Sequence, residues 1–252
     1  MLVFLLILFA HTLGAYEKPH GLDEEFWNVS QDYLFPENHQ LFNKLDTIFR
    51  KRRVTLSLDS LDKSGFTHIK QQPFTKMTTA VHKKLPGLFF KIYLDPQKPY
   101  KGKPEYEHWQ SRIHGSQIIK KMIVKNGWED IFTVPKKWMF PLPLKPEAPS
   151  PFKGVSFILV EEDMNLVSFK KNLRMWKSPL ITTEVLDRLF ILLTTLGLAD
   201  CITPKNLPFS QDGKIAFIDT QTSMQFPVNP KRLSKYLSDD MQVYWNKLLK
   251  SN

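Results

Sequence analysis

An amide and a carboxylate stand at the two ends of a hairpin predicted in the C-terminal half of the sequence. Asn206 precedes the apolar run 207–209, and Asp219 directly follows the apolar run 215–218. The Asp-Gly pair at 212–213 is a strong signal for a hairpin turn, so the two polar side chains should return side by side. Their oxygens suit a hard cation such as Mg²⁺, which also takes phosphate oxygens and water. The spacing predicts a metal site here, although both residue types are also common in plain turns.

A single lysine, Lys91, interrupts the apolar segment 88–94, which is the clearest strand in the sequence. A lysine in this setting needs a carboxylate or a phosphate as its partner, or else it reaches solvent at a strand edge. The helical pattern 104–124 follows and carries Glu105 and Glu107 in its first turn. Either glutamate could pair with Lys91, although each alone is also typical of a solvent-facing helix charge.

The elements that must position these residues follow from the apolar periodicity. Helical spacing in the first part of the chain gives way to strand patterns, and helices dominate the second half around the hairpin. The segments are amphipathic helix in 16–53, strands in 54–94, a loop in 95–104, a helix in 104–124, extended chain in 131–151, a buried strand in 155–160, a core helix from Thr182 or Thr183 to Gly197, and a helix from Asn229 to about Leu249 with a break at Ser238.

Four segments in this order resemble the protein-kinase-like fold, including its branch of aminoglycoside and choline kinases. Phe90-Lys91-Ile92 resembles the strand-3 lysine motif, and the strand 155–160 followed by Glu161-Glu162-Asp163 resembles the hinge that reads an adenine ring. Thr203-Pro204-Lys205-Asn206 resembles the end of a catalytic loop, and Ile218-Asp219-Thr220 resembles the metal-binding segment. The resemblance covers roughly residues 64–222.

This resemblance implies an α+β fold with two lobes: an antiparallel sheet in the N-lobe and a truncated, mainly helical C-lobe. It implies ATP and Mg²⁺ as cofactors, bound between the lobes. The implied residues are Lys91 with Glu105 or Glu107, Glu161 and Asp163 for the nucleotide, Asn206 and Asp219 for the metal, and Asp200 as the catalytic base.

The sequence also departs from the kinase-like pattern. Only Gly65 lies where the glycine-rich phosphate loop should be, between residues 64 and 82. The position of the catalytic base, five before Asn206, holds Cys201, and Asp200 is one position too early. A general base typically contributes about 10²–10⁴-fold to the rate. We therefore expect a weak nucleotide binder or pseudokinase; if the chain is active, it is an ATP-dependent phosphotransferase.

Composition narrows the alternatives. The 252 residues hold 35 Lys and Arg against 25 Asp and Glu, for a net charge of +10, and one cysteine, so no intrachain disulfide can form. Rossmann and P-loop glycine motifs, RNP-like aromatic stripes and zinc fingers are absent from the sequence. The basic run 50–53 fits a solvated helix end or a patch for anionic lipid or nucleic acid. The alternative function is a basic interaction protein that meets an acidic partner or surface without nucleotide.

The pattern of the N-terminal residues predicts that the protein is exported. Residues 2–9 are wholly apolar and the small residues Gly14 and Ala15 follow, as in a short signal peptide, although no Lys or Arg precedes them. This stretch is too short to span a bilayer. We expect a secreted, periplasmic or cell-envelope protein with a signal at 1–15, a helical extension at 16–53, an N-lobe at 54–160 and a C-lobe at 161–252.

Overall fold

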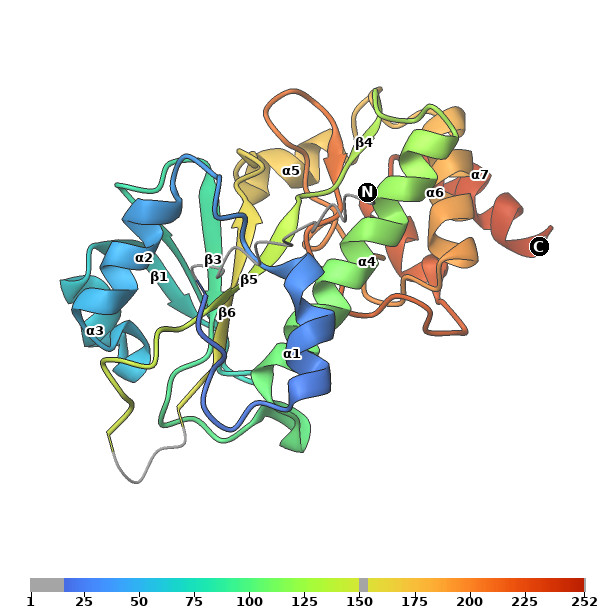
Figure 1. Cartoon of the computed structure of the whole chain (residues 1–252). Helices are drawn as coiled ribbons and strands as arrows, with labels where there is room; N and C mark the ends of the chain where they lie inside the picture. Colours follow the sequence, from blue (N-terminus) through green and yellow to red (C-terminus); the bar gives the residue numbers. More distant parts are fainter. Residues whose placement is uncertain (1–15, 150–153, 252) are drawn as a thin grey trace, which may run out of the picture.

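The chain forms an α+β fold in a computed structural model that describes residues 16–149 and 154–251 (Figure 1). The expected signal peptide at 1–15 lies outside the described residues. No helix in the described ranges is long and apolar enough to cross a membrane.

The centre of the N-terminal half is a five-stranded antiparallel sheet with the strand order β1-β2-β3-β6-β5. Its middle strand is β3, and the strand next to it, β6, arrives about seventy residues later in the chain. This confirms the α+β class and the antiparallel sheet. The strands are β1 (Phe66–Gln71), β2 (Thr78–His82), β3 (Leu88–Ile92), β5 (Lys137–Pro141) and β6 (Phe157–Glu162).

Helices cover both faces of this sheet. Side chains alternate between the two faces along each strand, so neighbouring residues of one strand can face different cores. Phe90 and Val160 face a core that includes Leu45 of α2 (Phe42–Lys51) and Leu61 of α3 (Leu58–Lys63). Leu159 faces a second core with residues of α4 (Glu105–Lys125). Figure 1 shows α2 and α3 on one side of the sheet and α1 (Glu24–Ser30) with α4 on the other.

The C-terminal half is mainly helical and has its own core. Trp176, Leu189 and Trp245 are fully buried there. The helix expected after Thr182 is confirmed, and the Thr182 hydroxyl accepts a hydrogen bond of 3.2 Å from the Val185 N–H. The elements are α5 (Phe169–Met175), α6 (Thr183–Thr195), the 3₁₀ helix η4 (Pro230–Tyr236), α7 (Asp239–Lys250), and the parallel pair β4 (Phe132–Thr133) and β7 (Ile215–Ala216).

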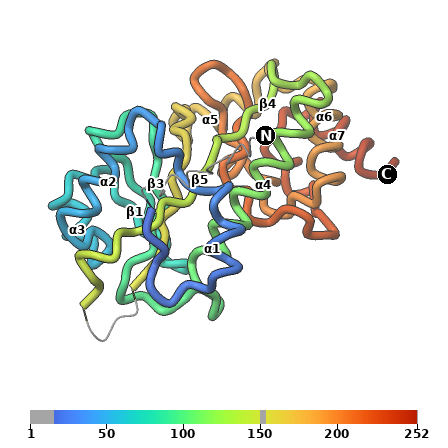
Figure 2. The backbone as a smooth tube through the Cα atoms, in the orientation of Figure 1, coloured from blue at the N-terminus to red at the C-terminus, as the bar shows by residue number. Residues whose placement is uncertain are grey.

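One helix, α4, belongs to both halves of the molecule. Its first turns place Trp109 and Ile113 against the sheet, whereas Ile119 and Ile123 near its other end lie in the helical core. The tube in Figure 2 shows α4 running from the sheet to the C-terminal helices. The helix predicted over 104–124 is therefore confirmed, and it physically connects the two cores.

The strand prediction at the start of the region 54–94 is wrong. Residues 54–63 form the 3₁₀ helix η2 (Val54–Leu56) and α3 instead of strands. The cause is local, because Ser57 is extended and its hydroxyl accepts a hydrogen bond of 3.0 Å from the Ser60 N–H. Such an N-cap favours a helix over a strand at this point. The other short 3₁₀ helices are η1 (Gln31–Tyr33) and η3 (Tyr100–Gly102).

Candidate functional site

Two lysines share one buried carboxylate on the face of the sheet that α4 covers. The Nζ atoms of Lys91 and Lys137 lie 2.9 Å and 3.0 Å from Oε1 of Glu161. Lys137 is paired directly with Glu161 across β5 and β6, while Lys91 is opposite Leu159 on the other side of β6. The three side chains are 8%, 0% and 4% exposed, in the order Lys91, Lys137, Glu161. The ionic cluster is therefore held by strand register and almost closed to water.

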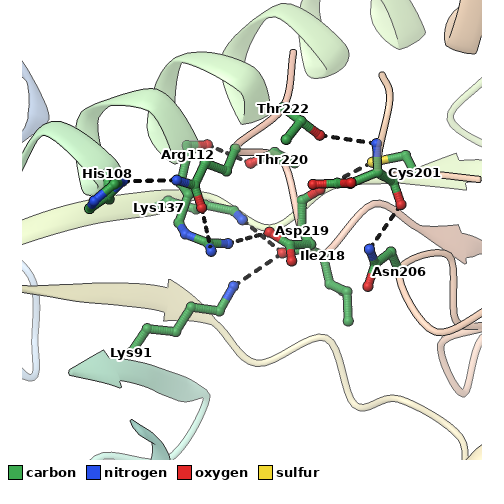
Figure 3. A network of polar contacts seen from close by, with 12 residues as sticks. Lys91, His108, Arg112, Lys137, Cys201, Asn206, Ile218, Asp219, Thr220 and Thr222 are labelled. Atoms are coloured by element: carbon green, nitrogen blue, oxygen red, sulfur yellow. Dashed lines mark hydrogen bonds and ion pairs between the residues drawn. The ribbon is translucent and has the colours of Figure 1, made fainter. Parts of the chain in front are cut away.

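Both lysines also bind the chain that follows β7. Lys91 and Lys137 donate hydrogen bonds of 3.2 Å and 2.9 Å to the carbonyl oxygen of Ile218 (Figure 3). The cluster therefore connects the sheet to the segment 218–222, which carries the expected metal ligand Asp219.

Arg112 of α4 reaches the same segment from the other side. Its Nη1 forms an ion pair with Asp219 Oδ1 (Figure 3). Its Nη2 donates a 2.8 Å hydrogen bond to Oε1 of Gln221. The hydroxyl of Thr220 donates to the main-chain carbonyl of Arg112 at 2.5 Å. Nε of Arg112 is buried and has no hydrogen-bond partner in the described part of the chain.

A glycine permits this close contact. A Cβ atom on Gly115 would lie 1.9 Å from the carbonyl oxygen of Thr220, far inside van der Waals contact. His108, on the same helix, adds a further bond, because its Nδ1 accepts a 2.9 Å hydrogen bond from Nε2 of Gln221. The segment 219–221 is therefore fixed along one side of α4.

The five charged groups do not balance. Lys91, Lys137 and Arg112 provide three positive charges against two carboxylates, Glu161 and Asp219, which leaves one positive charge in excess. Burial acts to raise the pKa of Asp219, but the charges of Arg112, Lys91 and Lys137 outweigh it and hold that pKa at about 2. Burial likewise opposes ionisation of Glu161, whose pKa is nevertheless lowered by the two lysines. Both carboxylates are ionised at neutral pH.

Lys137 has the opposite perturbation. Burial lowers its pKa to about 8; the charge of Glu161 acts against this shift, and the charges of Lys91 and Arg112 add to it. Lys137, whose side chain has no exposed surface, therefore loses its proton at a lower pH than an ordinary lysine does.

A cavity of about 310 Å³ opens beside Lys91. This volume is at the lower end of the range of small-ligand pockets, about 300–1,000 Å³. Its walls are mostly apolar, and its polar groups come from Lys91 and from the segment 161–163 at the end of β6. The lining residues are Val81, Phe89, Lys91, Pro135, Glu161, Glu162, Asp163, Met164, Leu166 and Ile218.

The expected pairing of Lys91 with a glutamate of α4 is wrong. Oε1 of Glu105 accepts hydrogen bonds from the N–H groups of Ser156 and Phe157, at 2.6 Å and 3.0 Å. Glu107 forms an exposed pair with Lys103 at 3.1 Å. Glu105 therefore binds the start of β6, and Glu107 binds an exposed lysine just before α4. Glu161 takes the place at Lys91 because β6 lies beside β3.

Asp200 and Asn206 are joined to each other through the main chain. Nδ2 of Asn206 donates a 2.8 Å hydrogen bond to the carbonyl oxygen of Asp200, and the N–H of Asp200 donates to the Thr222 hydroxyl at 3.0 Å. Cys201 is buried, and its thiol donates to the carbonyl oxygen of Asp219 at 3.1 Å. Burial raises the pKa of this thiol, so it is neither a base nor a nucleophile.

The side chains expected to hold Mg²⁺ are partly engaged in other contacts. Arg112 is paired with Asp219, and Asn206 uses its amide nitrogen on Asp200, which leaves only its carbonyl oxygen as a ligand. Over residues 16–149 and 154–251 no group of three or more His, Cys, Asp or Glu side chains could hold a metal ion. Magnesium binding at Asn206 and Asp219 stays a prediction.

Two charged side chains of this site, Arg112 and Lys137, were not predicted from the sequence. Arg112 sits between Trp109 and Ile113 on the buried side of α4, and a charge on an apolar helix face is a signal that could have revealed it. Lys137 directly precedes the apolar run 138–142 and is fully buried in β5. A lysine in this position, like Lys91, needs an anionic partner.

Comparisons of the chain with known protein families, with curated proteins and with solved structures find no match.

Proposed function

We propose that this protein is a kinase-like nucleotide binder with little or no phosphotransfer activity. The observation that carries the proposal is the position of Lys91, which lies both in the ionic cluster and in the wall of the 310 Å³ cavity. The base of the nucleotide would occupy the apolar cavity, and its phosphates would lie toward the excess positive charge of Lys91, Lys137 and Arg112.

The order of the elements supports the kinase-like part of the proposal. The third strand of the antiparallel sheet carries Lys91, a long helix follows it, and the strand beside it ends at Glu162. The segments with Asn206 and Asp219 then come from the helical half, as the resemblance requires. With no matching solved structure, this two-lobed interpretation rests on the order of elements and on the residues of the site.

The end of β6 offers main-chain groups to a flat, polar ring. Met164 lines the cavity, and no hydrogen bond to its N–H or carbonyl group occurs among the described residues. The neighbouring N–H of Asp163 is already bonded to the carbonyl of Gly87 at 2.9 Å. A purine edge could bind the free groups of Met164 while its faces contact Val81 and Leu166.

The same geometry argues for binding rather than catalysis. The residue at the family's base position, Cys201, is buried with its thiol turned to a carbonyl group. Asp200 is exposed, and the contacts that fix it come from its main chain. Phosphoryl transfer depends on positioning and on charge neutralisation by metal ions, and here Arg112 neutralises Asp219 instead.

Thermal unfolding with ATP or ADP, each with Mg²⁺ and with EDTA, tests the proposal. A ligand at 100 times its Kd stabilises the protein by about 2.7 kcal/mol, which is several degrees in Tm for a chain of this size. Lys91→Met should abolish the shift, whereas the matched variant Lys98→Met, at an exposed lysine outside the cavity, should keep it. No shift with millimolar nucleotide in either condition would contradict the proposal. Clear turnover of radiolabelled ATP, lost in Asp200→Ala, would instead establish an active enzyme.

The alternative function, an exported basic interaction protein, has one structural observation in its favour. A concave surface lined by basic residues lies on the α2 and α3 side of the sheet. Export through residues 1–15 stays a prediction for either function.

A further inference from the structure

A basic groove lies where one side of α2, the end of α3 and the turn after β2 meet. Its volume is about 720 Å³, more than twice that of the cavity at Lys91. Figure 1 places α2 and α3 at the end of the molecule away from the C-terminal helices. The groove and the cavity at Lys91 share no lining residue, so the groove is distinct from the proposed nucleotide site.

Most of the cations that line the groove have no carboxylate partner among the described residues. Lys63 is paired with Asp59 at 2.7 Å in an exposed ion pair, and Nη1 of Arg52 donates to the carbonyl oxygen of Lys63 at 3.2 Å. The other four lysines of the groove make no ion pair within the described ranges, and neither Asp nor Glu is among the lining residues. The six basic residues are Lys44, Lys51, Arg52, Lys63, Lys83 and Lys84.

The floor of the groove is fixed by His82 at the end of β2. Its Nε2 is 2.9 Å from the carbonyl oxygen of Ser64, and its Nδ1 accepts a 3.1 Å hydrogen bond from the Lys84 N–H. Nε2 therefore carries the proton and donates, so the ring is neutral with both nitrogens engaged. Gly65 has φ +93°, and a Cβ there would come within 2.8 Å of His82 Nε2. These contacts hold the lysines after β2 against the end of α3.

We propose that this groove binds a compact polyanion, a ligand that carries several phosphate or sulfate groups. Clustered positive charges raise the local concentration of anions in a concave site. Asn43 also lines the groove, and its side-chain amide can donate a hydrogen bond to a remaining oxygen of such a ligand.

The lining argues against two larger kinds of partner. Ile48 is the one large apolar side chain in the wall, so the groove offers little surface to the acyl region of a membrane. Phe, Tyr and Trp are missing from the lining residues, so bases of single-stranded nucleic acid would find no stacking platform. A compact, highly charged ligand fits both observations.

Isothermal titration calorimetry near physiological ionic strength tests the proposal with two probes, inositol hexakisphosphate and a heparin-derived tetrasaccharide. The phosphate and sulfate probes distinguish the two sources of the shared chemistry. We expect the native chain to bind at least one of them. The groove variant Lys51→Gln/Lys84→Gln should weaken that binding about tenfold, while the matched variant Lys120→Gln/Lys121→Gln, at two exposed lysines of α4, should change it less than twofold.

Three results would overturn the proposal. The first is no binding of either probe, and the second is an equal loss in both double variants, which would mean a response to net charge alone. The third is binding only to an oligonucleotide or only to vesicles with phosphatidylinositol bisphosphate, measured alongside. The groove variant should keep the Tm shift with ATP, and Lys91→Met should keep binding of the polyanion, so the two proposals fail separately.

Discussion

Arg112 and Asp219 form an ion pair across 107 residues of sequence and fix the segment after β7 to the helix that leaves β3. The guanidinium is 6% exposed and the carboxylate 35% exposed, so the pair lies at the boundary between the interior and solvent. It places a positive charge where the resemblance to kinases predicts a metal ion.

Nucleotide binding should not require a divalent cation in the native chain. Arg112 already neutralises Asp219, so ATP should raise the Tm about equally with Mg²⁺ and with EDTA. Arg112→Met should make the shift depend on Mg²⁺, because Asp219 is then free to bind the metal. Arg188→Met, at a half-exposed ion pair on α6, is the control. A shift that strictly needs Mg²⁺ in the native chain would show that Arg112 leaves Asp219 when nucleotide binds.

Asp219 should contribute to acid unfolding. Its folded pKa of about 2 is below the ordinary value of 3.8, so its stabilising effect is complete above pH 3.8 and is lost as the pH falls toward 2. The effect is about 1 kcal/mol after allowance for its partial exposure. Asp219→Asn should flatten urea stability between pH 4 and pH 2. Glu129→Gln, at an exposed carboxylate, should leave the slope as it is in the native chain.

Lys137 should titrate near pH 8, against an ordinary value of 10.5. Between these values the unfolded chain holds a proton that the folded chain has lost, so this group makes stability rise with pH from about 8 to 10.5. Lys137→Met should remove that rise in urea unfolding, and the exposed neighbour variant Lys136→Met should keep it. NMR of labelled lysine Cε and Nζ measures the titration directly. A Lys137 signal that stays unchanged up to pH 9.5 would disprove the assignment.

Gly115→Ala should separate α4 from the segment 219–221. The added Cβ would lie 1.9 Å from the Thr220 carbonyl oxygen, and that backbone must shift to make room. We expect a loss of about 1–3 kcal/mol, as for other overpacked sites, together with loss of the Tm shift by ATP. Gln117→Ala, an exposed position on the same helix, should be neutral or slightly stabilising. Native stability in Gly115→Ala would contradict the close packing of α4 against the Thr220 carbonyl group.

The sequence predicted the right residue but the wrong partner at Lys91. An apolar strand with one lysine signals a buried anion nearby, and that anion is Glu161. Its identity depends on the order of strands in the sheet, which brings β6 beside β3 from 70 residues away. Helical and strand periods describe local structure and do not give this order. Glu105 is closer to Lys91 along the chain, but Glu161 is the partner because it lies across the sheet from Lys91.

Other errors and omissions have local or tertiary causes. The segment 54–61 has leucines with strand-like spacing, yet the cap at Ser57 makes part of it a helix. Arg112 has no sequence motif, and its role depends on the segment 219–221 reaching α4. By contrast, the helices after Pro104 and Thr182, the break at Ser238 and the tight reversal at 212–213 followed from caps, turns and periodicity.

The position of α4 has a consequence for how the molecule unfolds. Its two ends are built into different cores, with Trp109 in one and Ile123 in the other. Neither half can melt while this helix stays whole and fully packed, so we expect heating to give one calorimetric transition. The slowest amide protons of α4 should then exchange with solvent only through that same global event.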